Sequence, residues 1–153
     1  MRPRIWRGVI TAITVMICSL AYGQTPIVRA ERELFASINQ ARRANGLPAL
    51  RWNEALGAAA RRHAGIMAEH GSAQHGFPGE PNLSARARQA GAHFGWLSEN
   101  VIQGSSPEFI HGQFMKSPPH RANILDKEMD SVGIGVVEQG RQLFAVEDFS
   151  QTR

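Results

Sequence analysis

Three side chains that could do chemistry stand in unusual surroundings. His75 lies in a glycine-rich stretch, His120 follows Ser117-Pro118-Pro119, and Glu99 lies among apolar residues. An acid in apolar surroundings is either buried or aimed into a cleft, and in both cases it needs a partner. Two imidazoles and one carboxylate form the ligand set of an open zinc site, and they equally form a general acid–base set. We expect the prolines to prevent a helix before His120 and to fix the backbone there.

These residues are far apart along the chain, so the fold must bring them together. Without a metal, Glu99 and an imidazole would form a charged pair that holds a strand to a loop. The sequence is therefore compatible with two interpretations, a functional cleft and a structural charged pair. In an enzyme, Glu99 and His120 would be the candidate catalytic groups, and Ser117 stands three residues before His120.

The hydrophobic pattern predicts the elements that must position these groups. Helices are expected over 27–44, from Asn53 to about residue 70, over 83–90, and from Ser106 to about residue 116. Residues 71–82 hold three glycines and two prolines, which predicts the loop that carries His75. Strands are expected over 96–102 and, as a hairpin, over 132–136 and 143–149. Helices outnumber strands without regular alternation, which favours an α+β fold with a small antiparallel sheet.

Residues 1–23 have the pattern of a signal peptide. Three arginines precede an uncharged, mostly apolar run over 9–21, and small residues stand at the expected cleavage site after Gly23. The run is shorter than the roughly 20 residues of a membrane span. We expect export to the periplasm or the exterior, with residues 24–153 as one domain that has no transmembrane segment. A retained N-terminal anchor is the alternative.

Charge and cysteine content exclude several classes of function. The net charge is +4, but the leader holds three of the 17 basic residues and none of the 13 acidic ones. The remaining domain is nearly neutral, so we expect no nucleic-acid partner. The single cysteine, Cys18, lies in the leader, so the mature chain has no disulfide and no thiol chemistry. The motifs HExxH and GxSxG are absent.

The other histidines receive structural interpretations. His63 and His70 fall on one face of their predicted helix, where packing in the core or at its rim is expected. His93 and His111 are expected to face solvent.

Tryptophans and paired arginines are assigned by the same reasoning. Trp52 and Trp96 are expected in the core. The pairs at 42–43 and 61–62 are expected on solvated faces, and Asn123 is expected to clamp the backbone near His120.

Two segments carry a resemblance to a known family. They are residues 114–125, Phe-Met-Lys-Ser-Pro-Pro-His-Arg-Ala-Asn-Ile-Leu, and residues 98–101, Ser-Glu-Asn-Val. The chain resembles the CAP superfamily of cysteine-rich secretory, antigen-five and pathogenesis-related proteins, and most of all its short bacterial members without disulfides. Weaker matches lie at 39–52, 132–135 and 146–149, and all of the matching segments come in the order in which the family has them.

The resemblance implies a three-layer α-β-α sandwich, the CAP or SCP fold, with a central cleft. It implies that His75, Glu99 and His120 lie in this cleft beside Ser117, where many members bind a divalent ion such as zinc. Eukaryotic members typically add a second glutamate on the helix before the last histidine. This chain has Lys116 and Ser117 there, so that fourth position is missing.

Three functions agree with these observations. The first is an exported CAP-domain protein whose cleft binds a small ligand, a lipid or a cell-wall component, with Zn²⁺ or another divalent cation as a candidate cofactor. The second is a metal-assisted hydrolase of peptide or ester bonds. The third is an envelope interaction module that does not use the cleft.

Overall fold

The computed structural model describes residues 26–152, and the predicted signal peptide lies outside this range. The described helices are α1 (Pro26–Ala44), α2 (Glu54–His70), α3 (Leu83–Gln89), α4 (Pro107–Lys116) and α5 (Pro118–Ile124). The described strands are β1 (Arg51–Trp52), β2 (Trp96–Gly104), β3 (Ser131–Gln139) and β4 (Gln142–Gln151). Across residues 26–152, no helix is both long and apolar enough to cross a bilayer.

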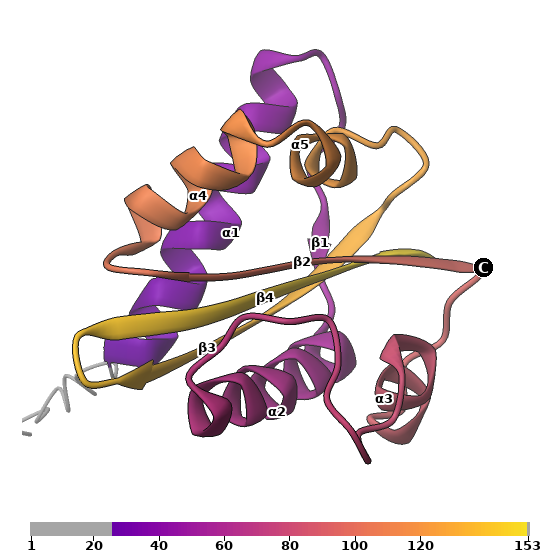
Figure 1. Ribbon diagram of the computed structural model, residues 1–153. Coiled ribbons are helices and arrows are strands. Elements are labelled where there is room, and N and C mark those ends of the chain that lie inside the picture. Colours follow the sequence, from indigo (N-terminus) through magenta and orange to yellow (C-terminus); the bar gives the residue numbers. More distant parts are fainter. Residues whose placement is uncertain (1–25, 153) are drawn as a thin grey trace, which may run out of the picture.

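One sheet separates two layers of helices (Figure 1). Its strand order is β1-β3-β4-β2, with antiparallel pairing except between β1 and β3. Helices α1, α4 and α5 cover one face, and α2 covers the other with α3 at its edge. The predicted three-layer sandwich is therefore confirmed. Strand β1 was not predicted, because two residues are too short for an alternating pattern.

Local capping explains the ends of the helices. The side chain of Asn53 accepts a hydrogen bond from the Leu56 backbone N–H at 3.1 Å, and α2 ends at Gly71 with φ of 61°. Ser106 accepts from the Phe109 N–H at 3.2 Å and opens α4. Both helix starts were predicted from these residue types.

Two glycines let α2 approach the sheet closely. A Cβ atom at Gly133 would lie 2.1 Å from the backbone nitrogen of Gly57, and one at Gly135 would lie 2.1 Å from that of Arg61. The alternate residues of β3, which include Val132 and Ile134, are buried in the core on the α1 side. The Val-Gly-Ile-Gly pattern thus gives one strand two different packing faces.

The expectation that the prolines prevent a helix at His120 was wrong. Pro118 and Pro119 begin α5, and His120 lies in its first turn. Proline is tolerated at the start of a helix because those N–H groups have no partner within the helix. Ser117 ends α4 and precedes α5, and its side chain makes no cap hydrogen bond to α5.

Arg42 was predicted on a solvated face, but it is 1% exposed. Its guanidinium donates to the backbone oxygens of Pro48, Ile124, Asp126 and Met129 at 2.8–3.1 Å. This side chain joins the end of α1 to the segment between α5 and β3.

Arg61 was also predicted on a solvated face, but its guanidinium is bonded to two acids. It donates through Nε and Nη2 to the buried Glu31 at 2.8 Å, and through Nη1 to Glu54 at 2.8 Å. These residues, together with Phe35 and Trp52, line a pocket of about 360 Å³. Both acids that line this pocket are thus bonded to Arg61.

The two tryptophans behave differently. Trp52 packs against the core and meets Phe35 edge-on, with ring centroids 5.5 Å apart. Trp96 is 64% exposed, so its predicted place in the core was wrong. It is the first residue of β2, which is an edge strand of the sheet.

Candidate functional site

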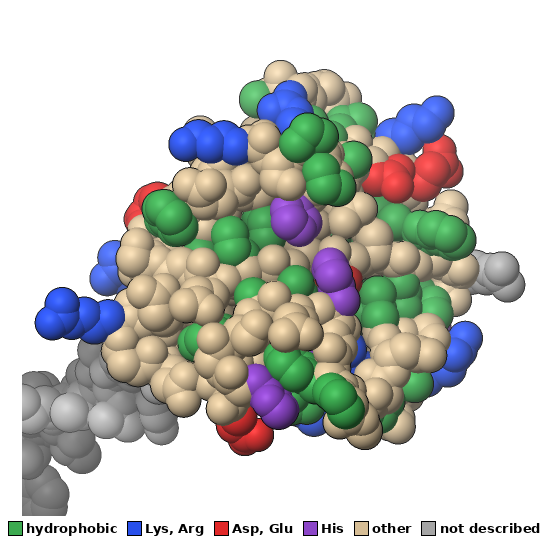
Figure 2. Space-filling model, in the orientation of Figure 1, with side chains coloured by type: hydrophobic (Ala, Val, Ile, Leu, Met, Phe, Trp, Pro, Cys, Tyr) green, Lys and Arg blue, Asp and Glu red, His purple; other side chains and the backbone are tan. Residues whose placement is uncertain are grey.

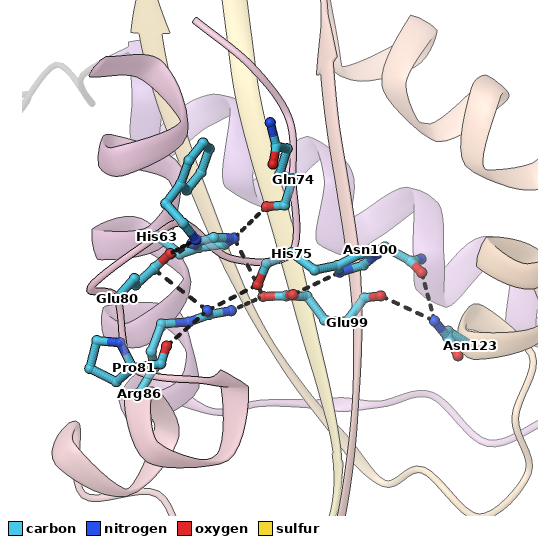
Figure 3. A network of polar contacts seen from close by, with 10 residues as sticks. His63, Gln74, His75, Glu80, Pro81, Arg86, Glu99, Asn100 and Asn123 are labelled. Atoms are coloured by element: carbon cyan, nitrogen blue, oxygen red, sulfur yellow. Dashed lines mark hydrogen bonds and ion pairs between the residues drawn. The ribbon is translucent and has the colours of Figure 1, made fainter. Parts of the chain in front are cut away.

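Glu99 and His75 meet, as one of the sequence hypotheses required. Glu99 lies in the middle of β2, and its side chain is buried on the α2 side of the sheet. Its Oε1 lies 2.9 Å from Nδ1 of His75 (Figure 3). The His75 side chain is 64% exposed, whereas that of Glu99 is 4% exposed. A buried carboxylate therefore holds one nitrogen of an imidazole that faces solvent.

Arg86 of α3 neutralises Glu99 from the opposite side. Its Nη2 contacts Oε2 of Glu99, and its Nη1 donates to the backbone oxygens of His75 and Pro81 at 3.2 and 3.3 Å. The guanidinium is buried with the carboxylate. The charged pair accounts for an acid in the core, because a buried charge requires a partner of opposite sign. Sequence analysis did not single out Arg86.

His63 and Glu80 extend this network into the loop. Nε2 of His63 lies 2.8 Å from the backbone oxygen of Gln74 and therefore carries a hydrogen, since that oxygen only accepts. Its Nδ1 lies 2.6 Å from Oε1 of Glu80, which is 3.5 Å from Nη1 of Arg86. The histidine, fully buried as predicted, ties loop 71–82 to α2 and so positions His75 (Figure 3).

Asp148 lies directly opposite Glu99 in the pairing of β4 with β2. Both of its side-chain oxygens are buried without a hydrogen-bond partner among the described residues. Burial, and next the negative charge of Glu99, raise the pKa of Asp148 well above its ordinary value, while Arg86 acts in the opposite direction.

Helix α5 brings His120 toward the same strand. Asn123 donates to Oδ1 of Asn100 at 2.8 Å and to the backbone oxygen of Glu99 at 3.3 Å, while Asn100 donates to the backbone oxygen of His120 at 3.2 Å. Asn123 is thus a clamp, as expected, but it reaches β2 rather than its own neighbours.

The ring of His120 is part-buried against Phe114, with centroids 5.1 Å apart. Burial, and secondarily the charge of His75, lower the pKa of His120. His120 is therefore neutral near pH 7, and its ring can offer a lone pair.

A second buried acid faces the α5 side of the sheet. Glu147 is opposite Asn100 in the strand pairing, and its Oε2 accepts from the Asn100 amide at 3.1 Å. Burial raises the pKa of Glu147 to about 8, and its Oε1 has no hydrogen-bond partner in the described chain. Asn100 therefore links a protonated acid to the backbone of His120.

The contacts of Glu99 determine whether these side chains could form a metal site. Both oxygens of Glu99 are engaged, one by His75 and one by Arg86. Within residues 26–152, no group of three His, Cys, Asp or Glu side chains is arranged to hold a metal ion. With both oxygens of Glu99 engaged, the set does not fit a three-ligand zinc centre.

The remaining histidines lie apart from this network. His70 is exposed and stacks on Phe77 with centroids 4.3 Å apart. His93 is exposed, as predicted. His111 was expected in solvent but is part-buried; burial lowers its pKa, and its Nδ1 has no hydrogen-bond partner in the described chain.

Comparison with known proteins identifies the class of this chain. Residues 35–149, more than half of the chain, match the model of the cysteine-rich secretory protein family, CAP. The chain belongs to this family. It is 28% identical over 111 residues to the uncharacterized protein YkwD of Bacillus subtilis, a match that covers 72% of this chain and 43% of YkwD. The chain thus matches less than half the length of that relative.

Solved structures show the same fold. An extracellular protein of Bacillus anthracis that contains an SCP domain superposes with a TM-score of 0.77 at 22% identity, over 82% of this chain and 41% of that one. An outer surface protein of Borrelia burgdorferi gives a TM-score of 0.75 at 17% identity, over 82% of this chain and 94% of that one. These similarities confirm the predicted CAP fold.

Proposed function

We propose that this chain is an exported ligand-binding domain whose ligand contacts His75 and His120. One observation carries the proposal: the buried Glu99 holds Nδ1 of His75 at 2.9 Å while the ring stays exposed. A hydrogen bond to one ring nitrogen fixes the tautomer and leaves the other nitrogen free to contact a ligand. The similarity to an extracellular protein and to an outer surface protein supports export.

A divalent ion is a candidate partner of these rings rather than a resident cofactor. Nε2 of His75 and the ring of His120 would hold it, and Glu99 would orient His75 from behind. Zinc bound in this way would act as a Lewis acid. Because structural and catalytic zinc sites use at least three protein ligands, we expect weak binding here.

Ligand binding is favoured over hydrolysis by what surrounds the imidazoles. The contact between Glu99 and His75 is one half of an activated-nucleophile arrangement, whose other half is a hydroxyl or thiol bonded to the ring. In the part of the chain that the structure describes, no hydroxyl is hydrogen-bonded to His75 or His120, and Ser117 makes no such contact. An envelope module that does not use these rings would keep its partner binding when they are removed. Variants that lack His75 or His120 therefore distinguish such a module from a ligand-binding domain.

Calorimetric titration with zinc tests the proposal. We expect one weak site in the protein, and a loss of affinity of about tenfold or more in His75→Ala and in His120→Ala, since each variant removes one of two ligands. His93→Ala, which removes an exposed histidine outside the network, should match the unaltered protein. Absence of zinc binding, or equal binding by all three variants, would contradict the proposal.

A further inference from the structure

The start of β2 and the end of the preceding loop form an aromatic-lined pocket. Its volume is about 380 Å³, and its lining includes Trp96, Phe94, Asn82 and Ser84. None of its lining side chains is ionisable. The size is within the range of small-molecule sites, and the lack of charge favours an uncharged ligand.

Trp96 presents a flat aromatic surface at this pocket. Its side chain is 64% exposed and is the most exposed of the large hydrophobic residues in the described chain. Figure 2 shows hydrophobic side chains gathered over the start of β2, beside a histidine on the same face of the molecule. An indole is apolar on its faces and carries one N–H donor at its edge, so it suits a ligand with both apolar and polar surfaces.

Polar groups stand beside this aromatic surface. Oδ1 of Asn82 accepts from the Ala85 backbone N–H and from the Ser84 hydroxyl, both at 3.0 Å, and these bonds fix the amide. No acceptor within the described chain takes the amide hydrogens of Asn82. The Ser84 oxygen keeps acceptor capacity. The pocket therefore offers a fixed donor and an acceptor beside an indole.

We propose that this pocket binds one ring of a neutral saccharide. The C–H face of the sugar would lie on the Trp96 indole, and its hydroxyl or acetamido groups would pair with Asn82 and Ser84. A purely apolar ligand would leave those two polar groups without partners, and the lining side chains themselves offer no charge to an ionic ligand.

The pocket adjoins the site proposed above. Trp96 and Glu99 lie three residues apart on β2, roughly 10 Å along a strand, and their side chains leave it on opposite faces. Ser84 and Arg86 share α3. The saccharide inference does not depend on the proposed function, and the pocket is tested separately.

Nuclear magnetic resonance of the ¹⁵N-labelled protein tests the inference, with tri-N-acetylchitotriose and cellotriose as probes. We expect the indole N–H signal of Trp96 to shift and saturate with a dissociation constant near 1 mM, on the order of weak single-site affinities. Binding by both saccharides would support stacking with hydroxyl contacts, and binding by chitotriose alone would support an acetamido contact.

Variants separate this pocket from other surfaces. Trp96→Ala should weaken saccharide binding at least tenfold, whereas Phe109→Ala, which removes an exposed aromatic ring from α4, should leave it unchanged. His75→Ala should keep saccharide binding at the Trp96 pocket while it loses zinc affinity, so the two proposals fail independently. No shift of Trp96 with either saccharide, unchanged binding in Trp96→Ala, or binding only of an apolar probe such as benzyl alcohol would overturn the inference.

Discussion

Replacing Arg86 with methionine should lower the free energy of unfolding by about 3–5 kcal/mol, the range for breaking a buried ion pair from one side. The side chain is 4% exposed and is the cation that contacts Glu99 and Glu80. Methionine fills much of the volume but leaves two buried carboxylates with only the imidazoles of His63 and His75 beside them. Urea unfolding at neutral pH measures the loss, and the His75 loop should also become more mobile by hydrogen exchange.

Arg88→Met is the matched control. Arg88 lies on the same helix but is exposed, and its guanidinium lies over the ring of Phe94 at 5.1 Å from the ring centroid. The same substitution there should change the free energy of unfolding by less than about 1 kcal/mol. Equal effects of the two substitutions would show that the buried charge network does not stabilise the fold.

Replacing Glu147 with glutamine should stabilise the protein at pH 7.5 by about 2 kcal/mol. Burial raises the pKa of Glu147 from 4.5 to about 8, so the fold keeps a proton that the unfolded chain releases above pH 4.5. Wild-type stability therefore falls as pH rises from 4.5 to 8, by up to about 4–5 kcal/mol from this group. Glutamine removes that loss and still accepts from Asn100, but its buried amide N–H lacks a partner, which costs about 1–3 kcal/mol.

The stability difference between Glu147→Gln and the unaltered protein should depend on pH. The gain should be present at pH 7.5 and absent or reversed at pH 4, where Glu147 is protonated in both states. The raised pKa of Asp148 gives a slope of the same sign, but it is common to both proteins and cancels in the difference. Glu138→Gln, at an exposed position of β3, should show no such trend. A Glu147→Gln difference that does not vary with pH would contradict the assignment.

The local features of the fold could be predicted because their causes lie within a few residues. Asn53 and Gly71 mark the ends of α2 by capping and by a positive φ, and the Val-Gly-Ile-Gly run marks a strand by its alternation. The proline error at α5 has a local cause too. The same residues that prevent a helix in its interior are allowed in its first turn, and sequence alone did not show which position they occupy.

The candidate site could be predicted only in part. An acid within an apolar strand indicated that Glu99 needed a partner, and His75 is one of its partners. Arg86 and the pair of His63 with Glu80 join residues from α2, α3 and the loop, and no spacing in the sequence indicates those contacts. Asp148 became recognisable only when the strand register placed it opposite Glu99.

The proposed function depends most directly on how Glu99 holds His75. Imidazole ¹⁵N NMR of the protein, at a pH where the ring is neutral, measures which nitrogen carries the hydrogen. We predict that Nδ1 of His75 is protonated and Nε2 is not, because the Nδ1 hydrogen lies against the Glu99 carboxylate at an N–O distance of 2.9 Å. Exposed His93 serves as an internal reference in the same spectrum. A His75 ring with its hydrogen on Nε2 would show that Glu99 does not present this imidazole to a ligand.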